Sequence, residues 1–177
     1  MQFGPIGEDL GVEFAAQMLS GLAHLHRSLI CHNSLTTAAV IIEEGKYTVK
    51  LRNLENISRA DDDLIPGLSL DLRGSDIHNA AVLLFQAITG VHPHATQDLY
   101  NLLELSSFDE YWRIIDPDLM LSLKFKTLFS KLLNPLYLCA SVEEVTSDPW
   151  FQQKSTTNYE WGMQNLIENQ SSIASFM

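Results

Sequence analysis

The segment over residues 76–89 constrains the fold most, because apolar side chains cover nearly the whole circumference of the helix it would form. Ser75 is a favourable N-cap residue, and Gly90 is a favourable C-terminal stop. A helix that is apolar on almost every side is buried inside a domain. We therefore expect a central helix over residues 76–89, around which the rest of the chain packs. It is shorter than the roughly 20 apolar residues that a membrane span needs.

The other patterns predict a mainly α-helical domain with one small β-hairpin. Apolar residues at helical spacing, together with the capping box that starts at Ser141, predict helices over residues 8–26, 97–105, 109–115, 123–133 and 141–148. Two short apolar runs around a glycine-containing turn predict the hairpin, over residues 38–42 and 47–51. We expect a loop over residues 53–74 and a polar tail over residues 152–177, helical only weakly near residues 161–167.

Composition excludes several classes of protein. With 177 residues and 46% hydrophobic residues, the chain suits one folded domain. The net charge of -11 argues against nucleic-acid binding, which requires a basic face. Two cysteines, Cys31 and Cys139, are too few for a disulfide framework, and no basic and apolar leader opens the chain. We therefore expect an intracellular, cytoplasmic protein with no membrane partner.

Five segments carry family motifs: FAAQMLSGLAHLH, ICHNSLTTAAVII, VKLRNLENIS, SDIHNAAVLLFQAITG and SVEEVTSDPWF. In this order and spacing they resemble the C-terminal lobe of the eukaryotic protein kinase fold. The stretch DLYNLLELSSFDEYWRII is similar to calmodulin-dependent-kinase-like members. The resemblance implies a kinase-like lobe over residues 8–151, preceded by a loop over residues 1–7. No glycine-rich loop or V-A-I-K lysine precedes Glu8, so we expect the N-terminal lobe to be missing and nucleotide binding to be absent.

The departures from the kinase motifs concern catalysis. Phosphoryl transfer needs a carboxylate that orients the acceptor hydroxyl, and Asp and Asn ligands for magnesium. At the H-R-D position, this chain has His32, Asn33 and Ser34. The position of the metal-binding Asn holds Ala39. The D-F-G position holds Asn53, Leu54 and Glu55. We expect no catalytic residue, metal or cofactor. The alternative is a divergent or truncated serine/threonine kinase that uses ATP and magnesium, with Glu55 as metal ligand.

Two residues at motif positions keep the family's structural types. The resemblance implies that His32 packs in the core and that Asp76 holds the backbone of the catalytic loop. The competing interpretation of Asp76 is an ordinary acidic residue in the first turn of a helix. The resemblance places the arginine of the family's buried ion pair at Cys139 and its glutamate near residues 69–71, where the glutamate is either conservatively replaced or absent.

The remaining candidates favour structural interpretations. His24, His26, Cys31 and His32 lack the ligand spacing of a zinc site. Ser34 and His32 have no orienting carboxylate for a hydrolase triad. The acidic run over residues 61–63 is typical of a solvated loop. We expect the three tryptophans, Trp112, Trp150 and Trp161, to pack in helical cores. Trp161 lies in the polar tail and is also a candidate anchor for a partner protein.

These observations favour an inactive kinase-like lobe that serves as a binding or scaffold module. We expect a protein partner or a homodimer, bound mainly by the helices over residues 97–133. The missing lobe should leave apolar residues near the hairpin uncovered, unless another chain or the tail covers them. Besides the kinase alternative, a degraded gene copy without a selected function stays open.

Overall fold

The structure, a computed structural model, describes residues 5–43, 45–59, 68–118, 120–135, 137, 141–153 and 157–174, without the side chains of residues 68–71 and 169–174. The helices are α1 (Gly7–Arg27), α2 (Leu68–Thr89), α3 (Gln97–Glu104), α4 (Phe108–Ile115), α5 (Leu123–Leu132), α6 (Val142–Thr146) and α7 (Tyr159–Ala174). The strands are β1 (Ile30–Cys31), β2 (Val40–Glu43), β3 (Thr48–Leu51) and β4 (Ser58–Arg59). Short 3-10 helices lie at Thr37–Ala39 and Leu54–Asn56.

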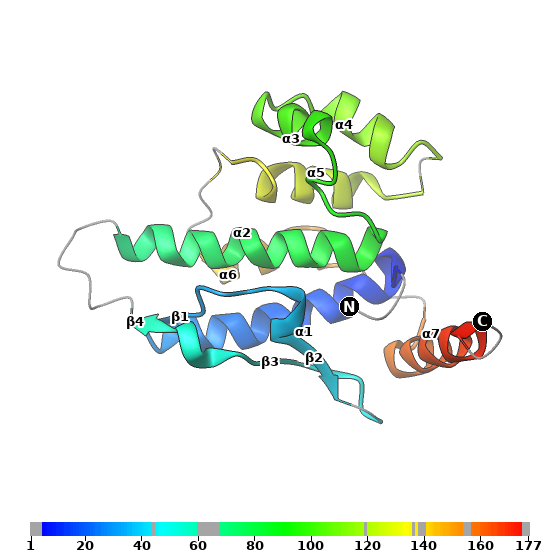
Figure 1. Ribbon diagram of the computed structural model, residues 1–177, viewed down its shortest axis with the longest axis horizontal. Coiled ribbons are helices and arrows are strands. Elements are labelled where there is room, and N and C mark those ends of the chain that lie inside the picture. Colours follow the sequence, from blue (N-terminus) through cyan, green and yellow to red (C-terminus); the bar gives the residue numbers. More distant parts are fainter. Residues whose placement is uncertain are drawn as a thin grey trace.

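Helix α2 lies at the centre of the molecule, between α1 on one side and α5 on the other (Figure 1). Between Ile77 and Ile88 its apolar residues are buried, apart from the half-buried Val82, as the sequence predicts. Phe85 contacts four aromatic rings, which come from α4 and α5: Tyr111, Trp112, Phe125 and Phe129. Gly11 lets α1 approach α2 closely, since a β-carbon there would lie 2.6 Å from Cγ1 of Ile88. The central helix is therefore the core that the other helices share.

The predicted hairpin is confirmed as the antiparallel pair β2 and β3, with Val40 opposite Leu51 and Glu43 opposite Thr48. It lies against α1, where Oε1 of Gln17 accepts a hydrogen bond from the backbone N–H of Val49 at 2.9 Å. All four β2 residues are only half-buried. The hairpin is thus anchored on one face and partly open on the other.

Two expectations about irregular segments are wrong. Helix α2 begins at Leu68, so Ser75 lies inside the helix and does not cap it. Part of the loop expected over residues 53–74 is ordered structure, because β4 pairs antiparallel with β1. Serine is tolerated inside helices as well as at caps, and two-residue strands have no periodicity, so neither feature was visible locally. Cys139 and residues 61–63 lie outside the described residues.

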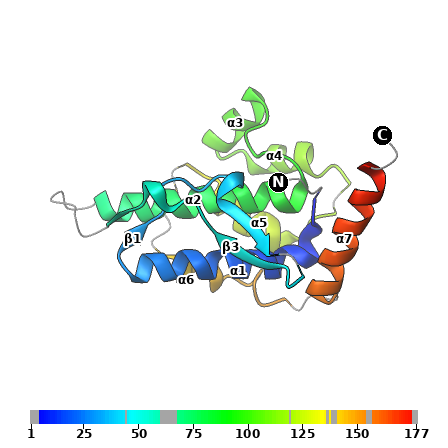
Figure 2. The same ribbon diagram turned by 60° about the horizontal axis from the view of Figure 1, so that its bottom comes forward.

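The tail is also more ordered than predicted, because α7 packs on the rest of the domain (Figure 2). The backbone N–H of Thr157 donates to Oδ2 of Asp9 at 3.0 Å, and the hydroxyl of Tyr159 donates to the carbonyl of Tyr47 at 3.2 Å. Met163 is fully buried. Helix α7 therefore covers the start of α1 and the turn of the hairpin.

The tryptophans divide between core and surface. Trp112 and Trp150 are buried in the core, as predicted, whereas Trp161 on α7 is 63% exposed. Across the described residues, the helices are too short or too polar to cross a lipid bilayer.

Candidate functional site

Asp76, on α2, is fully buried and organises the segment that follows β1. Its Oδ2 accepts a hydrogen bond from the backbone N–H of His32 at 2.7 Å, and its Oδ1 accepts one from the backbone N–H of Asn33 at 2.8 Å. Nε2 of His26 lies 3.0 Å from the same Oδ2. Because a carboxylate oxygen accepts, this imidazole nitrogen carries the proton. The hydrogen bonds expected of Asp76 are confirmed, and they fix the loop backbone against α2.

His32 is fully buried and connects this loop to the segment after β3. Its Nε2 donates to the carbonyl of Arg52 at 3.0 Å. Its Nδ1 accepts a hydrogen bond from the backbone N–H of Ser34 at 3.4 Å, so one neutral tautomer satisfies both contacts. The imidazole thus acts as a packing and positioning group inside the loop.

Two asparagines at motif positions have left-handed backbone, with φ of 60° at Asn33 and 61° at Asn53. Asparagine tolerates this region better than most residues. The Asn33 side chain donates to the carbonyl of Asn56 at 2.9 Å and to Oγ of Ser58 at 2.8 Å. The Asn53 side chain donates to the carbonyl of Ala38 at 3.3 Å. Both amides therefore join neighbouring loops.

The remaining motif residues offer little catalytic chemistry. Ala39 is buried, and its carbonyl accepts a hydrogen bond from the backbone N–H of Arg52 at 2.9 Å. Ser34 is half-buried, whereas Leu54 and Glu55 are exposed. A serine hydroxyl is too weakly basic to take a proton from an acceptor, and one carboxylate makes a poor magnesium site.

One buried cluster has ligand-type atoms that lie within 4.8 Å of one another: His26, Cys31 and Asp76. Their spacing in sequence gives no sign of it, since His26 and Asp76 are 50 residues apart. His24, which the sequence analysis considered with them, is exposed. The imidazole and the carboxylate are already hydrogen-bonded to each other, and the carboxylate also holds two backbone amides. A metal would displace these bonds, so the cluster is a hydrogen-bonded core.

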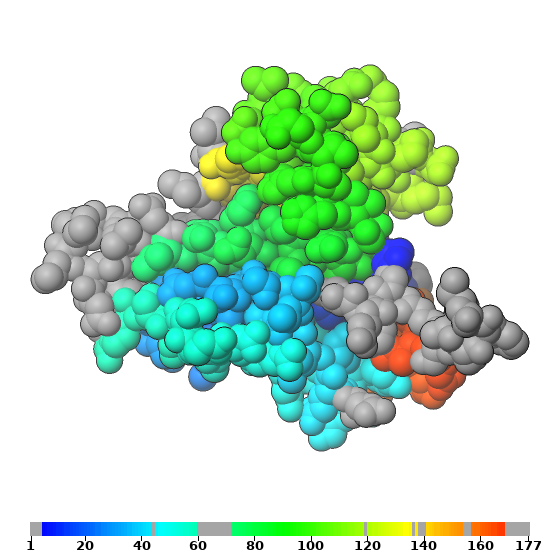
Figure 3. All heavy atoms as spheres, in the orientation of Figure 1, coloured from blue at the N-terminus to red at the C-terminus, as the bar shows by residue number. Residues whose placement is uncertain are grey.

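The helices α3, α4 and α5 form a projecting part of the molecule, of which Figure 3 shows one face. Four large apolar side chains in and beside them are at least half exposed: Leu105 at 75%, Ile114 at 50%, Met120 at 82% and Leu123 at 80%. We call these four residues the apolar patch. Such side chains on a soluble surface are typical of interaction sites when they gather in one region.

A hollow of about 540 Å³ lies between α4 and α5, beside Leu123 of the apolar patch. Asp116 and Lys126 form an ion pair in it, with 2.6 Å between Oδ2 and Nζ. Burial raises the pKa of Asp116, but hydrogen bonds from Lys126 and from the backbone N–H groups of Leu121 and Met120 outweigh it. The pKa of Asp116 is therefore lowered from its ordinary value.

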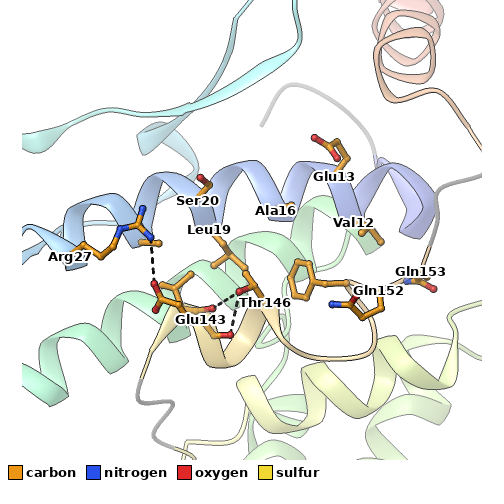
Figure 4. A pocket seen from close by; sticks show the side chains of 13 residues that line it. Val12, Glu13, Ala16, Leu19, Ser20, Arg27, Glu143, Thr146, Gln152 and Gln153 are labelled. Atoms are coloured by element: carbon orange, nitrogen blue, oxygen red, sulfur yellow. Dashed lines mark hydrogen bonds and ion pairs between the residues drawn. The ribbon is translucent and has the colours of Figure 1, made fainter.

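A second hollow, of about 440 Å³, lies between α1 and α6 (Figure 4). Val12, Ala16 and Ser20 line it from α1. At one end, Nη1 of Arg27 lies 3.5 Å from Oε1 of Glu143. Neither hollow is lined by Ser34, Asn53 or Glu55.

No family model matches the sequence. In structure, the chain is similar to a crystal structure of the Rad53 kinase domain and SCD2 in complex with AMPPNP, with a TM-score of 0.68, 18% identity, and coverage of 94% of this chain and 69% of that one. A crystal structure of the Rad53 kinase domain and SCD2 is similar at a TM-score of 0.68 and 19% identity, over 94% of this chain and 67% of that one. The chain therefore has a protein kinase-like fold, mainly helical with a small antiparallel β element, consistent with the C-terminal lobe. The calmodulin-dependent-kinase-like branch stays a prediction.

Proposed function

We propose that this chain is a catalytically inactive, kinase-like lobe that serves as a protein-interaction or regulatory module. One contrast carries the proposal. The buried scaffold of the catalytic loop is retained through Asp76, whereas the positions that need carboxylates hold Ser34 and Asn53. A chain with this contrast keeps the shape of the loop without its chemistry.

Loss of the general base alone lowers an enzymatic rate by about 10²–10⁴-fold. In kinases, the metal ion neutralises charge during phosphoryl transfer, and an asparagine and an aspartate bind it. Ala39 and Asn53 stand at these two ligand positions. We therefore expect no phosphoryl transfer, no bound nucleotide and no magnesium requirement.

The interaction surface that we propose is the apolar patch on α3, α4 and α5. One of its residues, Leu123, lines the hollow that holds Asp116 and Lys126, so an exposed apolar side chain lies beside a charged pair. Protein interfaces combine an apolar centre with a polar rim. We propose that a protein partner or a second copy of the chain binds there, in an intracellular setting, without nucleic acid or membrane.

A transfer assay with radiolabelled ATP tests the catalytic half of this proposal. The protein is incubated with magnesium or manganese and a general acceptor protein, beside the Ser34→Ala variant as control. We expect background transfer from both. Transfer that disappears on Asn53→Ala or Glu55→Ala would overturn the proposal in favour of a divergent serine/threonine kinase.

Sedimentation tests the interaction half. We expect the wild-type protein to self-associate, or to bind a partner, and expect Leu123→Lys to abolish that association. Leu29→Lys is the matched control, because Leu29 is also exposed but lies outside the apolar patch. A wild-type protein that stays monomeric at high concentration and binds no apolar dye would contradict the proposed surface.

A further inference from the structure

Strand β2 has one neighbouring strand, β3, in the described part of the chain. The hairpin projects at the bottom of the molecule in Figure 1. Strand β3 packs on α1, whereas β2 packs closely on β3 alone among the described elements. The side of β2 that faces away from β3 is therefore the edge of a sheet. We call it the outer edge of β2.

The hydrogen bonds of the hairpin fix which backbone groups lie on the outer edge. In an antiparallel pair, residues that bond to the partner strand alternate with residues whose N–H and C=O groups point away from it. The backbone N–H of Val49 donates to Oε1 of Gln17 on α1 at 2.9 Å, so it points away from β2. Ile42 lies opposite Val49. The N–H and C=O groups of Ile42 therefore point away from β3, toward the outer edge.

Val40 has the same orientation as Ile42. The backbone N–H of Arg52 donates to the carbonyl of Ala39 at 2.9 Å, so Ala39 is bonded across the hairpin and Val40, the next residue, points away. In the described part of the chain, the N–H groups of Val40 and Ile42 donate to no backbone outside the hairpin. Their spacing of two residues, about 6.6–6.8 Å, is the repeat at which another strand presents its own donors and acceptors.

The side chains of β2 lack the features that protect an exposed edge from pairing. Its first three residues are apolar, and it contains neither proline nor lysine. Its register with β3 is continuous, without a bulge. The charge of Glu43 is paired, because Nζ of Lys50 lies 2.9 Å from its Oε2. Natural sheets protect or cover edges that are built in this way.

From this arrangement we propose that the outer edge of β2 binds an extended segment of a partner protein, which adds a strand through main-chain hydrogen bonds. Addition of a strand to a sheet edge is a general mode of peptide recognition. A β-branched or aromatic residue of the segment packs beside Ile41, as cross-strand neighbours do. The net charge of -11 favours a basic segment and disfavours a second copy of the chain. This inference does not depend on the apolar patch.

Fluorescence anisotropy with a short labelled peptide of alternating valine and lysine tests the edge. We expect saturable binding to the wild type and binding at least about tenfold weaker to Ile42→Pro, because proline removes the N–H that faces the peptide. Ile42→Val is the matched control: it keeps this N–H and should bind within about twofold of the wild type. The fully N-methylated peptide has the same charge but no backbone donors, and we expect it not to bind.

Hydrogen exchange of the wild-type chain tests the edge without a variant. We expect the amide of Ile41, opposite Lys50, to be protected by the hairpin, and those of Val40 and Ile42 to exchange fast until the peptide slows them. Unchanged exchange of these two amides would overturn the proposal. So would equal binding of the N-methylated peptide, or equal affinity of the wild type and Ile42→Pro.

Two further outcomes identify a different binding arrangement. Loss of peptide binding in Leu123→Ser, with retention in Ile42→Pro, would place the peptide on the apolar patch and overturn the proposed edge while leaving the proposed function standing. A wild-type dimer in sedimentation that dissociates in Ile42→Pro would identify a second copy as the occupant and likewise overturn the proposal.

Discussion

The indole Nε1 of Trp150 donates a hydrogen bond to Oε1 of Glu8 at 2.9 Å, which joins residues 142 positions apart. The same carboxylate accepts from the backbone N–H of Ser122 at 2.8 Å and from the side chain of Gln153 at 3.2 Å. Glu8 therefore ties the start of α1 to the start of α5 and to the segment after α6. The side chain of one acidic residue thus connects the N-terminal part of the lobe to its C-terminal part.

This closure predicts that Glu8→Ala destabilises the fold. The substitution leaves several donors without their acceptor, and the loss should be about 1–3 kcal/mol in the free energy of unfolding. Urea denaturation followed by circular dichroism measures it. Glu55→Ala is the control, because Glu55 is exposed and should change stability by less than about 0.5 kcal/mol. Equal effects of the two changes would refute the structural role of Glu8.

Asp76→Asn should lower the free energy of unfolding by more than Glu8→Ala does. The amide group presents a donor where the carboxylate oxygens now accept from His26, His32 and Asn33. We expect a loss of about 2–4 kcal/mol, since bonds to a buried charge are among the stronger ones. The midpoint of urea denaturation reports the loss.

The control for Asp76→Asn is Asp98→Asn, in the exposed first turn of α3. If Asp76 were only a residue of the helix surface, both substitutions would have similar small effects.

Two glycines of α1 offer a matched pair of substitutions. At Gly11, a β-carbon would lie 2.6 Å from Cγ1 of Ile88 on α2, whereas at Gly21 the nearest contact is 3.4 Å, to Cδ1 of Leu51. Gly11→Ala should therefore cost about 1–3 kcal/mol through overpacking. Gly21→Ala should be neutral or stabilise by up to about 1 kcal/mol, because alanine favours the helix. Thermal denaturation of both variants shows whether the close approach of α1 and α2 is needed.

The ion pair of Asp116 and Lys126 predicts a pH dependence of stability. The pKa of Asp116 is lowered in the folded state, because hydrogen bonds from Lys126 and two backbone amides outweigh burial. A carboxyl whose pKa is lowered by folding stabilises the fold at every pH above the pKa that it has in the unfolded chain, about 4. This stabilisation is lost as the pH falls from there through the pKa of the folded state.

Asp116→Asn should thus be less stable than the wild type at pH 7, and the difference should shrink toward pH 3. Denaturation midpoints across this range test the sign. A difference that stays constant or grows in acid would show that the charge of Asp116 does not stabilise the fold.

The sequence predicted those helices in which apolar residues recur at regular spacing. The apolar circumference of residues 77–88 indicated a central helix, and the periodicity of residues 8–26 indicated α1, because both patterns are set by residues within a few turns. The pairing of β1 with β4 escaped prediction, since two-residue strands are defined by a partner far away in sequence. The contacts of Thr157 with Asp9 and of Tyr159 with Tyr47 escaped for the same reason.

The sequence by itself determined the departures from the kinase motifs: Ser34, Ala39 and Asn53 carry no carboxylate, whatever their surroundings. It also indicated Asp76 as a candidate anchor of the loop backbone, but left an ordinary acidic residue in the first turn of a helix as the alternative. Only the tertiary structure decided between the two, because a carboxylate becomes an anchor when burial removes water and backbone amides replace it.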